Sequence, residues 1–129
     1  MMNSLTIIAV ASGGAIGATL RLLINTFINK YFIHPLPLGT LGVNLLGSLL
    51  IGFLFAYFHL NTTLSPHLKT FMITGILGAL TTYSTFAIES FFLLESGDYF
   101  TAFLNMTLNL FGTILFAGIG YTLLLQFSK

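Results

Sequence analysis

Residues 75–86 read Gly-Ile-Leu-Gly-Ala-Leu-Thr-Thr-Tyr-Ser-Thr-Phe and lie within a long apolar stretch. Two glycines precede four serine or threonine residues that fall within five positions, 81–85. Glycine and β-branched residues form helices poorly, and hydroxyls can satisfy main-chain groups that a helix break sets free. At bilayer depth a break is tolerated only where the main chain is buried in protein or lines a cavity. We therefore predict an unwound segment at an ion site, the alternative being a continuous helix with a polar packing face.

The surrounding composition is that of a membrane protein. The chain is 56% hydrophobic and only 5% charged, with a mean hydropathy of +0.98. Soluble domains carry roughly a quarter charged residues, and a membrane helix needs about 20 mostly apolar ones. We expect one all-α transmembrane domain over residues 1–129. Its four helices are predicted at about 4–28, 38–60, 67–94 and 99–127, and short loops make neighbouring helices antiparallel.

The few charges bear on topology and on partners. Four spans place Lys69 and Lys129 on one side, against Lys30 and the deeper Arg21 on the other. This near-tie under the positive-inside rule predicts dual topology, in which the chain inserts both ways and pairs antiparallel. One weakly specified orientation is the alternative. A net charge of +1 lacks the basic face of a nucleic-acid binder, and the absence of β-barrel patterning favours an inner (plasma) membrane.

Uncharged polar residues recur at helical spacing in the second and fourth predicted helices. Residues four apart share one helix face, so each set forms a stripe. The stripes are Thr40, Asn44 and Ser48 on one helix and Asn105, Asn109 and Thr113 on the other. Amide and hydroxyl donors suit an anion without burying a cation. We interpret the stripes as two walls of one polar path, although interhelical hydrogen bonding is the alternative for each asparagine.

Four further side chains are candidates. Tyr83 and Phe86 are three apart, and the positive edges of their rings could accept an anion, or the rings could simply pack. Glu89 is the only acidic residue inside a span, which makes it a functional candidate unless it is solvated near the interface. Arg21 continues the small-residue stripe of Gly13 and Gly17. It either reaches towards the interface or attracts anions.

Three segments in order resemble the Fluc (CrcB-type) fluoride channel family. They are residues 13–21, residues 39–47, and residues 75–86 followed by Glu89, and the resemblance covers essentially the whole chain. It implies an antiparallel homodimer with two fluoride pores along the subunit interface. It also implies a structural Na⁺ on the dimer axis, bound by the backbone carbonyls of Gly78 and Thr81 from each chain.

The resemblance and the polar stripes together predict the site residues. The fluoride pathway comprises Asn44, Tyr83, Ser84, Thr85, Phe86, Asn109 and Thr113, with Arg21, Thr40 and Glu89 in vestibule or supporting roles. Tyr83 departs from the family, which has phenylalanine there. Its hydroxyl would need a partner when buried, either the ion or Asn109.

The function implied is passive fluoride export rather than enzymatic catalysis. Composition and spacing alone indicate only a small polar solute. Two alternatives remain, a proton-coupled exporter of the small multidrug type and a non-transporting assembly subunit. The exporter would want a carboxylate within residues 5–28, and that stretch has none.

Overall fold

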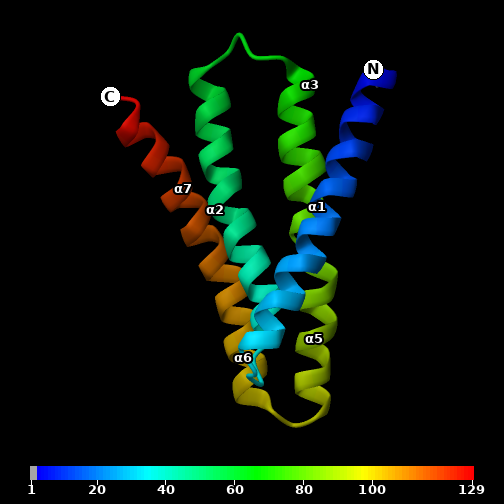
Figure 1. Ribbon diagram of the computed structural model, residues 1–129. Coiled ribbons are helices and arrows are strands. Elements are labelled where there is room, and N and C mark those ends of the chain that lie inside the picture. The colour runs from blue at the N-terminus through cyan, green and yellow to red at the C-terminus, as the bar shows by residue number, and fades with distance from the viewer. Residues whose placement is uncertain (1–2) are drawn as a thin grey trace.

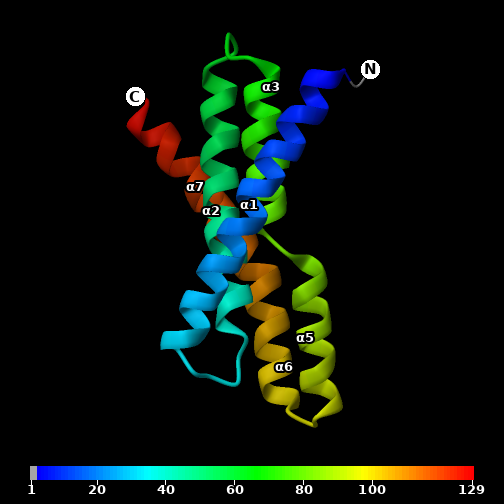
Figure 2. The ribbon, with the colours of Figure 1, turned by 45° about the vertical axis from the view of Figure 1, so that its right-hand side comes forward.

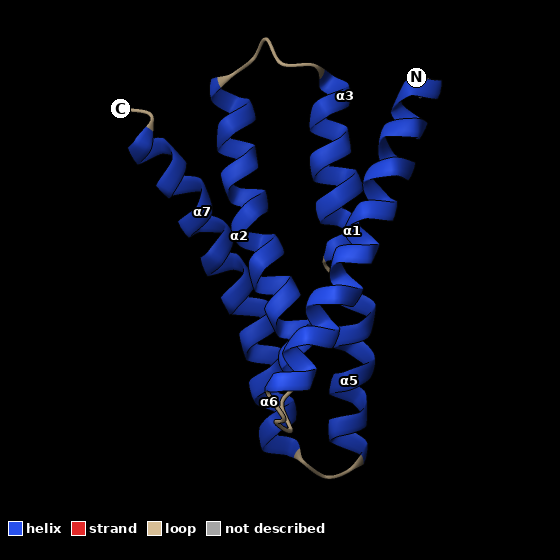
Figure 3. Ribbon diagram, viewed as in Figure 1, coloured by secondary structure: helices blue, strands red, loops and turns tan. Residues whose placement is uncertain are grey.

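The computed structural model describes residues 3–129, so Met1 and Met2 of the predicted domain lie outside the described residues. Four long apolar helices dominate the described chain, each with the length and hydropathy to cross a membrane. They cover Ser4–Tyr31, Leu38–Leu60, Pro66–Glu95 and Tyr99–Phe127 (Figure 1). Short loops join them, as Figure 3 shows. The protein is a multi-pass membrane protein.

The first helix, α1 (Ser4–Tyr31), ends three residues beyond its predicted end at Ile28, whereas α2 (Leu38–Leu60) has the predicted bounds. The side-chain amide of Asn29 donates to Asn25 Oδ1 at 2.7 Å, one turn back. The polar residues therefore support the last turn instead of ending it. The N–H of Phe32 closes the helix on the Ile28 carbonyl at 2.8 Å.

The third span is interrupted, but over fewer residues than the sequence indicates. It consists of α3 (Pro66–Lys69), the π-helix η1 (Thr70–Leu77), α4 (Gly78–Leu80) and α5 (Tyr83–Glu95). Only Thr81 and Thr82 leave the helical region, with ψ of 155° and 111°. The expectation of unwinding across residues 75–86 was too broad. Gly75 stays helical within η1 and packs against Gly13, since an added Cβ would lie 2.9 Å from the Gly13 Cα.

The fourth span consists of α6 (Tyr99–Thr107), the π-helix η2 (Leu108–Gly112) and α7 (Thr113–Phe127). A tight turn joins it to α5. Gly97 has a φ of 83°, a left-handed conformation that favours glycine. Asp98 then caps α6, its Oδ1 accepting from the Thr101 N–H at 3.2 Å. This turn makes α5 and α6 an antiparallel hairpin.

In the view of Figure 1 the helices spread apart towards the end of the molecule that carries both termini. The α2–α3 loop lies at the same end, as four antiparallel spans require. The α1–α2 and α5–α6 connections lie at the opposite end in both views (Figures 1 and 2). Figure 2 shows the unwound stretch that precedes α5 near the middle of the molecule's long axis.

Glycines allow the helices to touch through their backbones. A Cβ on Gly17 of α1 would lie 2.1 Å from the Ile76 carbonyl oxygen in η1. Where α2 crosses α7, a Cβ on Gly52 would meet the Ala117 oxygen at 1.9 Å, and one on Gly120 the Leu49 oxygen at 2.0 Å. Small residues permit such close approach in lipid, where packing drives helix association.

Polar side chains form a sizeable part of the buried centre of the fold. Its apolar cluster is small, consisting of Val43, Leu77 and Leu80. The buried polar residues are Thr40, Asn44, Thr82, Ser90, Asn105 and Asn109. Because a buried polar group is costly without a hydrogen-bond partner, the contacts among these side chains decide how the centre is built.

Candidate functional site

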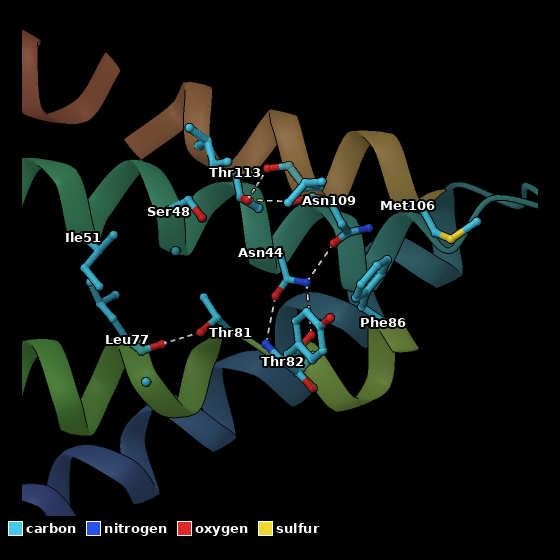
Figure 4. Close-up of a pocket in the computed structure, with 15 residues that line it drawn as sticks. Asn44, Ser48, Ile51, Leu77, Thr81, Thr82, Phe86, Met106, Asn109 and Thr113 are labelled. Atoms are coloured by element: carbon cyan, nitrogen blue, oxygen red, sulfur yellow. Dashed lines mark hydrogen bonds between the residues drawn. The ribbon is translucent and has the colours of Figure 1, made fainter. Parts of the chain in front are cut away.

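Asn44 of α2 binds the main chain of the helix break. Its Oδ1 accepts the Thr82 N–H at 2.8 Å, and its Nδ2 donates to the Thr82 carbonyl at 3.1 Å (Figure 4). One side-chain amide thus satisfies both main-chain groups of an extended residue. Leaving them unpaired in a buried place would cost about 1–3 kcal/mol each. Asn44 therefore compensates for the main-chain hydrogen bonds that the break removes at Thr82.

The hydroxyl of Thr82 caps the N-terminus of α5. Its Oγ1 accepts the Thr85 N–H at 3.2 Å and donates to Thr85 Oγ1 at 2.9 Å. This is the usual capping contact of a threonine before the first helical turn. One hydroxyl of the run at 81–85 thus satisfies a main-chain N–H next to the break, as the sequence predicts for hydroxyls at such a place. Ser84 lies beside it with its Oγ 3.5 Å from Thr82 Oγ1, and Ser84 is exposed.

The break deprives two carbonyls of the N–H donors that they would have in a continuous helix. In an unbroken helix the Gly78 carbonyl would accept the Thr82 N–H, and the Thr81 carbonyl would accept the Thr85 N–H. Both N–H groups donate to side chains instead, to Asn44 and Thr82 respectively. Gly78 and Thr81 also both line a pocket that opens beside the break. Carbonyl oxygens released in this way fit a hard cation, although a full coordination shell needs more than one chain provides.

A pocket of about 490 Å³ opens beside the break. It brings together most of the predicted pathway and both predicted cation ligands, seven of the twelve predicted site residues: Asn44, Gly78, Thr81, Tyr83, Phe86, Asn109 and Thr113. Its other lining residues include Ser48 and Thr82, and Figure 4 shows residues of α2, of the segment around the break and of the fourth span facing it. Part of each predicted stripe therefore borders this cavity, namely Asn44 with Ser48 and Asn109 with Thr113, whereas Thr40 and Asn105 do not line it.

The remaining predicted residues lie outside the pocket lining. Thr40 is buried and donates its hydroxyl to Glu89 Oε1 at 2.8 Å. Among residues 3–129, Glu89 Oε2 is buried without a hydrogen-bond partner. Ser84 and Thr85 lie at the start of α5, and Arg21 is half-buried on α1. The stripe on α2 is therefore split, because Thr40 bonds α5 while Asn44 bonds the break.

The aromatic pair of α5 is arranged edge to face. The ring centroids of Tyr83 and Phe86 lie 5.4 Å apart with an interplanar angle of 68°. Asn109 Oδ1 accepts from Asn44 at 2.9 Å, and Asn109 Nδ2 donates to Asn105. The alternative in which the Tyr83 hydroxyl pairs with Asn109 does not describe this structure.

Sequence reasoning missed three contributors. Thr82 was considered only as part of the hydroxyl run, although a threonine three residues before Thr85 at a helix start is a capping signal. Asn105 was seen as a member of a stripe but not as a site residue. Ser90 carries no signal in the sequence, because its contact with Asn105 depends on how α5 and α6 pair.

Comparison with known proteins agrees with this architecture. The family model described as CrcB-like protein, Camphor Resistance (CrcB), matches residues 8–121. A protein of Sulfurimonas denitrificans is 56% identical over 120 residues, 93% of each chain. One of Campylobacter jejuni is 47% identical over 121 residues, 94% of this chain and 97% of its own.

A third relative, from Nautilia profundicola, is 42% identical over 116 residues, 90% of this chain and 91% of its own. All three relatives carry the name fluoride-specific ion channel FluC. They are membrane channels and not enzymes. With its four spans, its interrupted third helix and this similarity over nearly its full length, the chain belongs to the CrcB/FluC family.

Proposed function

We propose that the chain forms a channel that exports fluoride passively, as an antiparallel homodimer of dual topology with two pores. The pocket beside the break is the observation that carries the proposal. It combines neutral polar side chains and aromatic rings, and none of its lining residues is charged. The names of the relatives supply the ion.

A second copy of the chain completes the pathway in this proposal. The Tyr83 side chain is 80% exposed although it lines the pocket, and Ser84 is exposed beside it. Polar groups facing lipid in the middle of a span are costly, so a partner surface is the favourable neighbour. The near-balance of lysines at the two ends supports a partner of opposite orientation.

In this proposal, uncharged groups coordinate the anion as it passes through the pore. Hydroxyl groups and positive ring edges replace the water of a small anion without holding it as a fixed cation would. Asn44 contributes by bracing the break that carries these groups, since both its amide hydrogens are engaged by Thr82 and Asn109. The gradient and the membrane potential set the direction of flow, at about 2.3 kcal/mol per charge per 100 mV.

The carbonyls of Gly78 and Thr81 are the groups of this chain that would hold Na⁺. A bound cation offsets the repulsion of carbonyl dipoles that two chains bring together. Two copies in antiparallel orientation would present four such oxygens. The ion is therefore proposed as a structural part of the dimer and not as a carrier of flux.

Fluoride efflux from liposomes that contain the purified protein tests the function. Efflux that follows an added K⁺ leak and needs no pH gradient supports the channel. Efflux that requires proton exchange supports the multidrug-type exporter, for which Glu89, already bonded to Thr40, is the one carboxylate inside a span and away from its ends. No efflux from folded protein supports the assembly subunit.

Tyr83→Phe is expected to keep conduction within roughly tenfold of the unmodified protein, because the ring edge remains and only a hydroxyl is removed. The same liposome assay measures it. Tyr99→Phe, at an exposed ring at the start of α6, is the matched control. Complete loss of flux in Tyr83→Phe alone would make the hydroxyl essential and contradict a pathway based on ring edges.

A further inference from the structure

The orientation of the Asn44 amide is determined by main-chain atoms. The Thr82 N–H can only donate and the Thr82 carbonyl can only accept. Asn44 must therefore direct its Oδ1 to the first and its Nδ2 to the second, as it does at 2.8 and 3.1 Å. A flip of this amide would place donor against donor and acceptor against acceptor.

The orientation of the Asn44 amide also determines the orientations of two further asparagine amides. Asn44 Nδ2 donates to Asn109 Oδ1 at 2.9 Å, so the nitrogen of Asn109 must face the other way. Asn109 Nδ2 donates to the backbone oxygen and to Oδ1 of Asn105, both at 3.0 Å. Asn105 Nδ2 in turn donates to Ser90 Oγ at 2.9 Å. The bonds that link Asn44 to Asn109, Asn109 to Asn105 and Asn105 to Ser90 are thus all donated in the direction of Ser90.

Little solvent reaches the members of the series. Asn105 is 0% exposed, Ser90 and Asn109 are 6% exposed, and Asn44 is 7% exposed. In such surroundings an unpaired polar group is costly, and neighbouring hydrogen bonds strengthen one another. The loss of one hydrogen bond in the series therefore weakens the neighbouring one.

The series forms a closed circuit with the chain itself. Helix α5 begins directly after Thr82 and carries Ser90 two turns later. From Ser90 the bonds return through Asn105 of α6, Asn109 of η2 and Asn44 of α2 to Thr82. A shift of α5 against α2 would strain this circuit at both ends.

We infer that Asn105 and Ser90 are positioning residues, which hold the Asn109 amide with its Oδ1 towards Asn44 and so support the side chain that braces the helix break. The inference rests on the proposed channel function for its effect on flux. Neither residue lines the pocket, so they act on the ion only through Asn44 and Asn109. The requirement at position 90 is a hydrogen-bond acceptor, not merely a side chain that fills space.

The test uses Ser90→Ala, which removes the acceptor, and Ser90→Thr, which restores a hydroxyl. Solid-state NMR of the reconstituted protein with ¹⁵N-labelled asparagine follows the side-chain amides of Asn44 and Asn109, and liposome efflux follows function. Ser90→Ala should shift both amide resonances and lower fluoride flux roughly tenfold, since one buried donor loses its partner. Ser90→Thr should return both readouts towards those of the unmodified protein.

Ser12→Ala is the matched control, because Ser12 is exposed on α1 and its hydroxyl bonds only its own helix. Should Ser90→Ala fail to fold, Ser90→Cys keeps the volume with a weak acceptor and should change both readouts in the same direction. Unchanged Asn44 and Asn109 resonances in a variant that lacks the oxygen would overturn the inference. Absent flux from the unmodified protein would instead contradict the proposed channel function. The Asn44 and Asn109 resonances would still test whether Ser90 holds the series of hydrogen bonds in place.

Discussion

Asn44→Asp is expected to reduce fluoride efflux by about a hundredfold or more. The substitution places a negative charge beside the proposed anion pathway. It also replaces the donating nitrogen by an oxygen that faces two acceptors, the Thr82 carbonyl and Asn109 Oδ1. Two like charges about 4 Å apart repel by about 4 kcal/mol at an effective dielectric constant of 20, which alone exceeds a hundredfold. Efflux from liposomes at equal protein content measures the effect.

Asn61→Asp makes the same chemical change away from the site. Asn61 is exposed after the end of α2, where its amide donates to the Tyr57 carbonyl at 2.9 Å. This variant should conduct like the unmodified protein. If Asn44→Asp did so too, Asn44 would neither brace the break nor border the pathway, and the proposed site would be misplaced.

Gly17→Ala should produce a large loss of stability. An added Cβ would lie 2.1 Å from the Ile76 carbonyl oxygen and 2.9 Å from its carbon. Because these are backbone atoms, no side-chain rotation relieves the clash, and α1 must move away from η1. Overpacking costs about 3 kcal/mol at the upper end of its usual range, while alanine regains about 1 kcal/mol of helix propensity. We expect a net loss of about 2 kcal/mol.

Gly14→Ala is the control on the same helix. Nothing lies within 4 Å of the Cβ that it would add, so only the gain in helix propensity applies. Thermal unfolding in detergent, followed by circular dichroism at 222 nm, should therefore separate the two variants in opposite directions. Equal unfolding midpoints for both would mean that the α1–η1 contact is looser than the structure indicates.

The four spans could be predicted because hydropathy is a local property. The bounds of α2 agree with the prediction to the residue, and the polar stripes were placed on their helices by spacing alone. The break was predicted in the right segment for the right reason, since glycine and threonine weaken a helix there. Its extent was not. Thr82 is held by Asn44, which lies 38 positions away along the chain.

The hydrogen-bond partners of individual polar groups could not be predicted from the sequence. Thr40 and Asn44 share one helix face, yet one bonds Glu89 of α5 and the other bonds the break and Asn109. The Asn44–Asn109 bond joins residues 65 positions apart. No pattern within either helix specifies that meeting.

By itself, then, the sequence determined that this protein lies in a membrane, spans it four times and carries two neutral polar stripes beside a weak point in its third helix. Only the tertiary structure decided that Thr81 and Thr82 alone unwind, that Gly75 serves packing, and that Ser90 ends a series of hydrogen bonds. The physical reason is one of range. Hydropathy and helical period act between near neighbours, whereas a buried amide finds its partner only once separate helices have packed.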